Sequence, residues 1–162
     1  MSGIISLPTL RSTVTGFVLL ALSGCEAPGD GGGESAPGQE KTVIKTADVI
    51  GPYSPGVNVG RLLFVSGQIA LDPETGELRD ESIEAETRQA LANLSGVLDA
   101  AGYDASHVVR ATVYLTDIGD YKRVNAVYAD FFPDGSYPAR VAVEVARLPA
   151  NASVEISAIA YK

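Results

Sequence analysis

Two segments near the C-terminus decide the fold, YPARVAVEVARLP at residues 137–149 and VEISAIA at residues 154–160. Side-chain character alternates along both, and a period of two predicts strands, whose successive side chains point to opposite faces. We expect the two strands to form a hairpin with one apolar face that packs beneath helices. That face would carry Val141, Val143, Val145, Val154, Ile156, Ala158 and Ala160. The other face carries Arg140 and Glu155 among small side chains, which leaves room for a ligand.

Composition narrows the classes of function. The 162 residues carry a formal net charge of −8 and contain no basic run. A nucleic-acid partner is therefore disfavoured, because affinity for the phosphate backbone depends on clustered Lys and Arg. The single cysteine, Cys25, excludes an intramolecular disulfide and a thiolate metal cluster. The single histidine, His107, excludes a site built on two histidines.

Residues 1–24 are predicted to be a lipoprotein signal peptide. A weakly basic start ends at Arg11, and the apolar run 14–22 is too short to span a bilayer as a mature helix. LSGC at residues 22–25 resembles the lipobox of bacterial lipoproteins, so we expect acylation of Cys25. An ordinary signal peptide with a chance cysteine is the alternative. The residue after the cysteine is Glu26 rather than aspartate, which favours a periplasmic location on the outer membrane.

Residues 25–41 are rich in Gly, Pro, Ser and acidic side chains and are predicted to form a flexible tether. The folded domain is expected to span residues 42–162. Besides the two C-terminal strands, it should contain strands at 42–46, 61–66, 68–71 and 107–116 and helices at 82–101 and 121–132. This order, β-β-β-α-β-α-β-β, predicts an α+β two-layer sandwich with both helices on one face of a mostly antiparallel sheet.

The longer helix shows the clearest amphipathic pattern. Its apolar stripe comprises Ile83, Ala90, Leu91, Leu94, Val97, Leu98 and Ala101, and its outer face comprises Glu84, Glu86, Arg88 and Asn93. Gly102 is the expected residue just past its C-terminus. The sheet face without helices would bear Ala142, Ala146 and Ile159 beside Arg140 and Glu155. A half-bare sheet of this kind predicts a homo-oligomer.

Several blocks of the sequence closely resemble the Rid family, the reactive intermediate deaminases also called YjgF or L-PSP proteins, and in particular the RidA branch. The blocks are GPYS (51–54), VSGQ (65–68), NAVY (125–128), YPAR (137–140), VEVARLP (143–149) and VEISAIA (154–160). The resemblance implies a chorismate-mutase-like fold and a homotrimer with active sites between subunits. It also implies hydrolysis of enamines and imines, of the 2-iminobutanoate and 2-iminopropanoate type, to 2-keto acids and ammonia. No metal and no cofactor are implied.

The resemblance also assigns roles to individual residues. Arg140 would bind the substrate carboxylate, which a permanently charged guanidinium can do with two hydrogen bonds. Glu155 would hold the hydrolytic water. The other substrate-binding residues that it implies are Tyr53, Ser66, Gly67, Tyr121 and Asn125. The chain departs from the family pattern at Ala142, where many members have cysteine, so regulation through that thiol is excluded.

Other interpretations of the same residues stay open. Arg140 could form a structural ion pair with Glu144, and Glu155 could be an exposed strand carboxylate. For the whole domain, the alternative to a deaminase is a non-catalytic trimer that binds small carboxylates or acts as a chaperone. An endoribonuclease is less favoured, because the net charge is −8 and basic side chains are not clustered.

Overall fold

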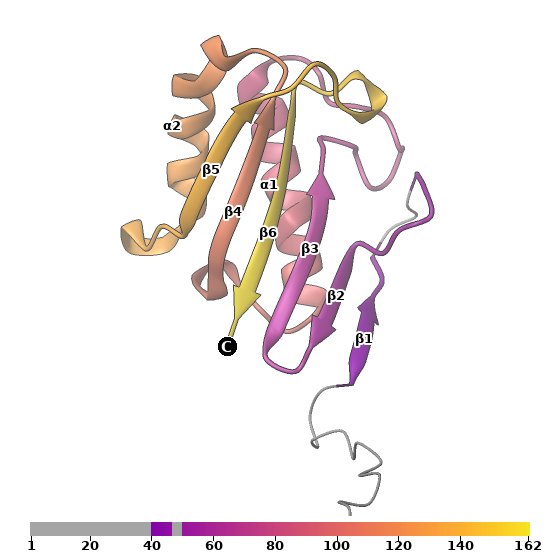
Figure 1. The fold of residues 1–162 in the computed structure, drawn as a ribbon. Helices are drawn as coiled ribbons and strands as arrows, with labels where there is room; N and C mark the ends of the chain where they lie inside the picture. Colours follow the sequence, from indigo (N-terminus) through magenta and orange to yellow (C-terminus); the bar gives the residue numbers. More distant parts are fainter. Residues whose placement is uncertain (1–39, 47–49) are drawn as a thin grey trace, which may run out of the picture. The chain divides into compact units, whose positions relative to one another are not determined.

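The computed structural model describes residues 40–46 and 50–162 of the chain. The predicted signal peptide, Cys25 and nearly all of the predicted tether lie outside the described residues. Within them, six strands form one sheet in the order β1-β2-β3-β6-β4-β5, and two α-helices cover one of its faces (Figure 1). No helix in these two ranges combines the length and the hydropathy needed to cross a bilayer.

The number and order of strands and helices match the prediction, although the second and third strands lie at other residues than expected. The elements are β1 (Lys41–Ile44), β2 (Gly56–Val59), β3 (Leu62–Gln68), α1 (Ile83–Ala100), β4 (Val108–Leu115), α2 (Tyr121–Phe131), β5 (Ala139–Glu144) and β6 (Val154–Tyr161). β4 and β5 run parallel, and the other neighbouring strands run antiparallel. The predicted α+β two-layer sandwich with a mostly antiparallel sheet is therefore confirmed.

The second and third strands differ from the prediction. β2 lies at residues that we expected to be loop, and it joins β3 through a two-residue turn at Gly60 and Arg61. Gly60 has the positive φ, 59°, that such a turn favours. No separate strand forms at 68–71, because Gln68 ends β3 and Leu71 makes only an isolated bridge with Leu78. The sequence does not predict β2, because a run of four residues, one of them glycine, is too short to show the alternation of a strand.

The expected hairpin of the two C-terminal strands is wrong. β5 pairs in parallel with β4, with Arg140 opposite Ala111, whereas β6 lies between β3 and β4. Residues 145–153 carry the chain past the end of β4 before it enters the middle of the sheet (Figure 1). The physical reason is that alternation identifies a strand and its two faces, whereas it says nothing about which neighbour supplies the hydrogen bonds.

The hydrophobic core lies between the two helices and the sheet. β6 turns every second side chain towards the helices, and Val154 and Ile156 are fully buried. α1 meets them with Leu94, Val97 and Leu98, each at most 1% exposed. Burying one such side chain contributes roughly 1.5–3 kcal/mol, so the contact between β6 and α1 stabilises the domain substantially.

Local signals delimit α1. The Ser82 hydroxyl accepts a hydrogen bond from the Ala85 N–H (3.2 Å), and Gly102, with φ of 74°, follows the last turn as predicted. One residue of the expected outer face is misplaced, because Glu86 is only 3% exposed. A charge at that position predicts exposure by default, whereas the carboxylate in fact has a partner inside the protein.

The two faces of β5 are reversed relative to the prediction. Val141 and Val143 are 44% and 38% exposed, whereas Arg140 and Ala142 are partly buried on the helix side. The small Ala142 packs against the core. β6 follows the prediction, with Glu155 on the uncovered face. The uncovered face therefore exposes large hydrophobic side chains from β5, which is typical of a surface that another protein covers.

Candidate active site

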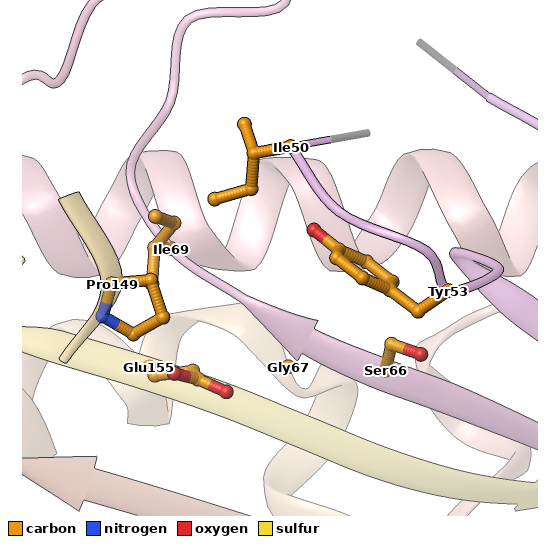
Figure 2. A pocket seen from close by; sticks show the side chains of 7 residues that line it. All are labelled: Ile50, Tyr53, Ser66, Gly67, Ile69, Pro149 and Glu155. Atoms are coloured by element: carbon orange, nitrogen blue, oxygen red, sulfur yellow. The ribbon is translucent and has the colours of Figure 1, made fainter. Parts of the chain in front are cut away.

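Four of the predicted site residues meet in one pocket, at the end of β3 and the start of β6 (Figure 2). The pocket holds about 230 Å³ and opens to solvent. Its lining is Ile50, Tyr53, Ser66, Gly67, Ile69, Pro149 and Glu155. We call this pocket the Glu155 half-site. Apolar walls with a few polar groups are typical of sites for small organic molecules.

Gly67 makes room for the Glu155 side chain. A Cβ atom at position 67 would lie 2.6 Å from the carboxyl carbon of Glu155 and would overlap one of its oxygens. The register of β3 on β6 shifts between Val65 and Gln68, so Gly67 lies in an irregular stretch of the ladder. Glycine at this position therefore lets the carboxylate lie directly against the β3 backbone.

Burial raises the pKa of the Glu155 carboxyl above its ordinary value of 4.5. Among the described residues, no Lys, Arg or His lies within 4.0 Å of this carboxylate. The same ranges contain no cluster of three or more His, Cys, Asp and Glu residues arranged to hold a metal ion. A carboxylate with a raised pKa binds a proton more firmly than free glutamate, which suits it to take a proton from water.

Ser66 holds the loop that carries Tyr53. Its hydroxyl donates to the Ser54 carbonyl at 2.7 Å, and its N–H donates to the Pro55 carbonyl at 2.9 Å. These bonds fix the loop beside the end of β3, where Tyr53, 45% exposed, lines the pocket. Because the hydroxyl proton of Ser66 is engaged in this way, Ser66 contributes shape to the pocket rather than a free donor.

The other three predicted residues form a second cluster, on α2 and β5. Nη2 of Arg140 donates to Asn125 Oδ1 at 2.7 Å and to the Tyr121 hydroxyl at 3.2 Å. The guanidinium carbon lies 4.4 Å from the centre of the Tyr128 ring and 5.7 Å from that of Tyr121. Hydrogen bonds lower the pKa of the Tyr121 hydroxyl, and the bond with Asn125 has a larger effect than the bond with Arg140. We call this cluster the Arg140 half-site.

Arg140 keeps donors available for a ligand. Both of its hydrogen bonds leave from Nη2, so Nε–H and the Nη1 hydrogens have no acceptor within residues 40–46 and 50–162. In the same part of the chain, no Asp or Glu lies within 4.0 Å of the guanidinium. Glu144, the alternative ion-pair partner, instead accepts the Ile118 N–H at 2.9 Å. A guanidinium that neutral groups orient and no carboxylate neutralises is suited to bind an incoming carboxylate.

The two half-sites lie on opposite faces of the sheet. Arg140 shares the helix face with its buried partner Ala111, whereas Glu155 and its partner Tyr114 belong to the uncovered face. Val143 is opposite Tyr114, so Arg140 is two strands and three residues from Glu155. That places their Cα atoms on the order of 14 Å apart at ordinary strand spacings. In a 2-imino acid, the substrate that the sequence resemblance implies, the carboxylate and the C2 atom are adjacent, so one chain alone cannot bring both half-sites to one such molecule.

Sequence reasoning missed several residues that shape the half-sites, namely Ile50, Ile69, Pro149 and Tyr128. For Tyr128 a signal existed, because positions 121, 125 and 128 have the i, i+4, i+7 spacing that places side chains on one face of a helix. For the apolar lining no signal existed, because single isoleucine or proline residues in loops have no period from which to infer a common neighbour.

Several known proteins are similar to this chain in sequence and fold. The family model described as endoribonuclease L-PSP matches residues 43–162. A RutC family protein of Pyrococcus horikoshii is 51% identical over 125 residues, 75% of this chain and 98% of that protein. The 2-iminobutanoate/2-iminopropanoate deaminase of Mus musculus is 47% identical over 121 residues, 75% of this chain and 89% of that protein. The crystal structure of Escherichia coli TdcF with bound serine is 38% identical, covers 75% of this chain and 98% of that one, and gives a TM-score of 0.71.

Proposed function

Because the chain belongs to the Rid family, the endoribonuclease L-PSP group that residues 43–162 match, we propose that it hydrolyses 2-imino acids and their enamine tautomers to 2-keto acids and ammonia. The observation that carries the proposal is the Arg140 guanidinium, oriented by Asn125 and Tyr121 and without an acidic partner among the described residues. The 47% identity to a deaminase named for 2-iminobutanoate and 2-iminopropanoate supports small 2-imino acids as substrates.

The proposal requires two copies of the chain at each site. One copy would supply the Arg140 half-site and a second copy the Glu155 half-site, because one chain holds them on opposite faces of its sheet. The exposed Val141 and Val143 on the uncovered face offer a hydrophobic surface for that contact. In a cyclic homotrimer, each pair of neighbouring copies would complete one site, giving three equivalent sites.

The chemistry follows from the two half-sites. Arg140 would bind the substrate carboxylate through its free Nε–H and Nη1 donors and so fix the position of the adjacent C2 atom. Glu155 would accept a proton from water as the water oxygen bonds to C2, and the imine nitrogen would take up a proton from solvent. Glu155 would then return its proton to the nitrogen of the aminol, the C–N bond would break to release ammonia, and the hydroxyl proton would pass to solvent, which leaves the 2-keto acid and an ionised Glu155. The apolar walls formed by Ile50 and Pro149 would contact the substrate side chain.

The proposal can be tested with the folded domain, residues 41–162. An L-amino-acid oxidase would generate 2-imino acids in situ, and semicarbazide would trap the imine that remains. We expect the wild-type domain to lower the amount of trapped imine and Arg140→Ala to lose this effect. If the folded wild-type domain leaves every imine of the panel untouched, the catalytic proposal is wrong, and a small-carboxylate-binding module takes its place.

We further propose that Cys25 is acylated and tethers the domain to the periplasmic side of a bacterial membrane, with the outer membrane favoured. The motif LSGC at residues 22–25, at the end of an apolar run, supports this proposal. Expression of the full chain in a bacterium that processes lipoproteins tests it. The wild-type chain should fractionate with membranes and Cys25→Ala should not, and a wild-type chain found wholly in the soluble fraction would contradict the anchor.

A further inference from the structure

Glu86 is a buried carboxylate that the proposed reaction does not use. It lies in the first turn of α1 and is 3% exposed. Within the described part of the chain, no Lys, Arg or His lies within 4.0 Å of it. The positive end of the α1 dipole favours a negative charge there. A buried carboxylate needs hydrogen-bond donors, and the donor that the structure gives it is informative.

That donor belongs to the segment leading into the Glu155 half-site. Glu86 Oε2 accepts the Ser153 N–H at 2.7 Å, across 67 positions of sequence. On its other side, Ser153 offers its carbonyl to the Thr116 N–H at 3.1 Å. Ser153 is therefore held from both sides of its peptide backbone, by α1 and by the end of β4. Pro149 lies four residues before it and Glu155 two residues after it, and both line the pocket.

The segment between Pro149 and Ser153 is strained. Ala150 and Asn151 both have positive φ, 53° and 59°, in the short turn Pro149–Asn151, although neither residue is glycine. Asparagine adopts this conformation comparatively readily, whereas alanine avoids it unless surrounding contacts impose it, so the strain lies at Ala150. The contacts available are the Ala152 N–H bond to the Pro149 carbonyl, 3.0 Å, and the two bonds that hold Ser153. Loss of the Glu86 bond would free the turn to relax.

We propose that Glu86 is a positioning residue of the active site: its buried carboxylate, by accepting the Ser153 N–H, holds the strained turn and so sets the placement of Pro149 and Glu155. The inference rests on the proposed function only in so far as Glu155 acts on substrate. The structural half, that Glu86 orders residues 149–155, stands apart from any activity. Glu86 touches no substrate and acts only through Ser153.

Three variants separate this role from general stability. Glu86→Gln keeps an acceptor oxygen for Ser153, whereas Glu86→Leu has a similar size and no acceptor. Thr87→Val is the matched control, because Thr87 is the next residue, is fully buried, and its hydroxyl donates only to Ile83 in the same helix (2.6 Å). Should Glu86→Leu fail to fold, Glu86→Ala removes the acceptor with a smaller side chain.

Amide hydrogen exchange of residues 149–155 and steady-state kinetics would be measured on the same samples. We expect Glu86→Leu to speed exchange in this segment by about tenfold or more, while Glu86→Gln and Thr87→Val stay within about twofold of wild type. We expect kcat of Glu86→Leu to fall by about tenfold at a KM within about twofold, with Glu86→Gln restoring kcat, because Glu155 moves while the Arg140 half-site stays intact.

Two results would overturn the inference: wild-type exchange in the 149–155 segment of Glu86→Leu, or an equal loss of protection in Thr87→Val. Normal kcat in Glu86→Leu despite faster exchange would overturn the catalytic half. If the wild-type domain has no deaminase activity, the proposed function fails, while hydrogen exchange still decides whether Glu86 orders the turn.

Discussion

The carboxylate of Glu155 occupies the space that a Cβ atom would fill at Gly67. The missing side chain at Gly67 on β3 thus leaves the space that the Glu155 side chain of the neighbouring strand β6 fills. The match explains why a glycine stands at the end of β3 and why its substitution should act on chemistry rather than on the core.

Gly67→Ala is expected to displace Glu155 and to lower kcat by roughly 10- to 100-fold, because small misplacements of a reacting group are costly. The added methyl group would lie 2.6 Å from the Glu155 carboxyl carbon, so the carboxylate must move. Gly96→Ala on α1 is the matched control, because a Cβ there meets nothing within 4 Å. Steady-state kinetics of both variants check this, and a Gly67→Ala enzyme with normal kcat would show that the position of Glu155 is irrelevant.

Arg140→Lys is expected to raise KM strongly and to lower kcat/KM by about 100-fold. Lysine keeps the charge but cannot bond Asn125 and Tyr121 while offering a planar pair of donors to a carboxylate. Arg88→Lys, on the exposed side of α1, should leave the kinetics unchanged. Equal kinetics for Arg140→Lys and wild type would mean that charge alone binds the substrate.

Tyr128 offers a test that separates a ring from its hydroxyl. The hydroxyl is buried without a hydrogen-bond partner among the described residues, and burial raises its pKa to about 12. Tyr128→Phe should therefore raise the free energy of unfolding by about 1 kcal/mol and leave the kinetics unchanged. Tyr128→Leu should raise KM several-fold, because Arg140 loses the aromatic face 4.4 Å from its guanidinium carbon. Denaturant unfolding and kinetics measure both effects, and a lower stability for Tyr128→Phe would contradict the account.

The raised pKa of Glu155 predicts a pH dependence of stability with a definite sign. The folded state holds the proton more firmly than the unfolded state, so wild-type stability should fall as the pH rises from the ordinary value of 4.5 through the raised folded-state value. Above that window the stability cost is fully present and no longer changes. Glu155→Gln carries no titrating group, so its stability relative to wild type should rise through the same window. Denaturant unfolding of both proteins from pH 4 to pH 8 measures the difference, and a difference that falls with pH contradicts the assignment.

The raised pKa of Glu155 also predicts the pH at which deaminase activity falls on the acid side. Deaminase activity should be lost, as the pH falls, at a value above 4.5, because protonated Glu155 cannot accept a proton from water. The pH dependence of kcat/KM measures this acid limb. An acid limb below pH 4.5 would mean that Glu155 is not the group whose ionisation is observed.

Sequence patterns predicted both helices, and for α1 this was possible because Ser82, Gly102 and the apolar stripe are local signals that act within one element. Sequence patterns did not predict strand pairing or the orientation of β5, because both depend on residues that are distant in the sequence. The alternation of β5 defines two faces but does not show which one meets the helices. The inner face is that of Ala142, which packs against the core, whereas Val141 and Val143 face outward.

The candidate site divides in the same way. The family resemblance named the residues of both half-sites, and the structure brings each half together from separate segments. The division of Arg140 and Glu155 between two faces depends on strand pairing, which the alternation of the two C-terminal strands does not specify. Glu86 was missed because a charge on a helix predicts exposure, and its partner lies 67 positions away.

The central claim is that Arg140 of one copy and Glu155 of another act on the same substrate. Co-expression of Arg140→Ala and Glu155→Ala chains with different tags, followed by purification of the mixed oligomers, tests it most directly. In a cyclic trimer that contains both variants, one of the three sites combines an intact Arg140 with an intact Glu155 from the neighbouring copy. We therefore predict about a third of wild-type kcat from the purified mixed trimers and none from either variant alone. Mixed oligomers that are as inactive as the single variants would contradict the account.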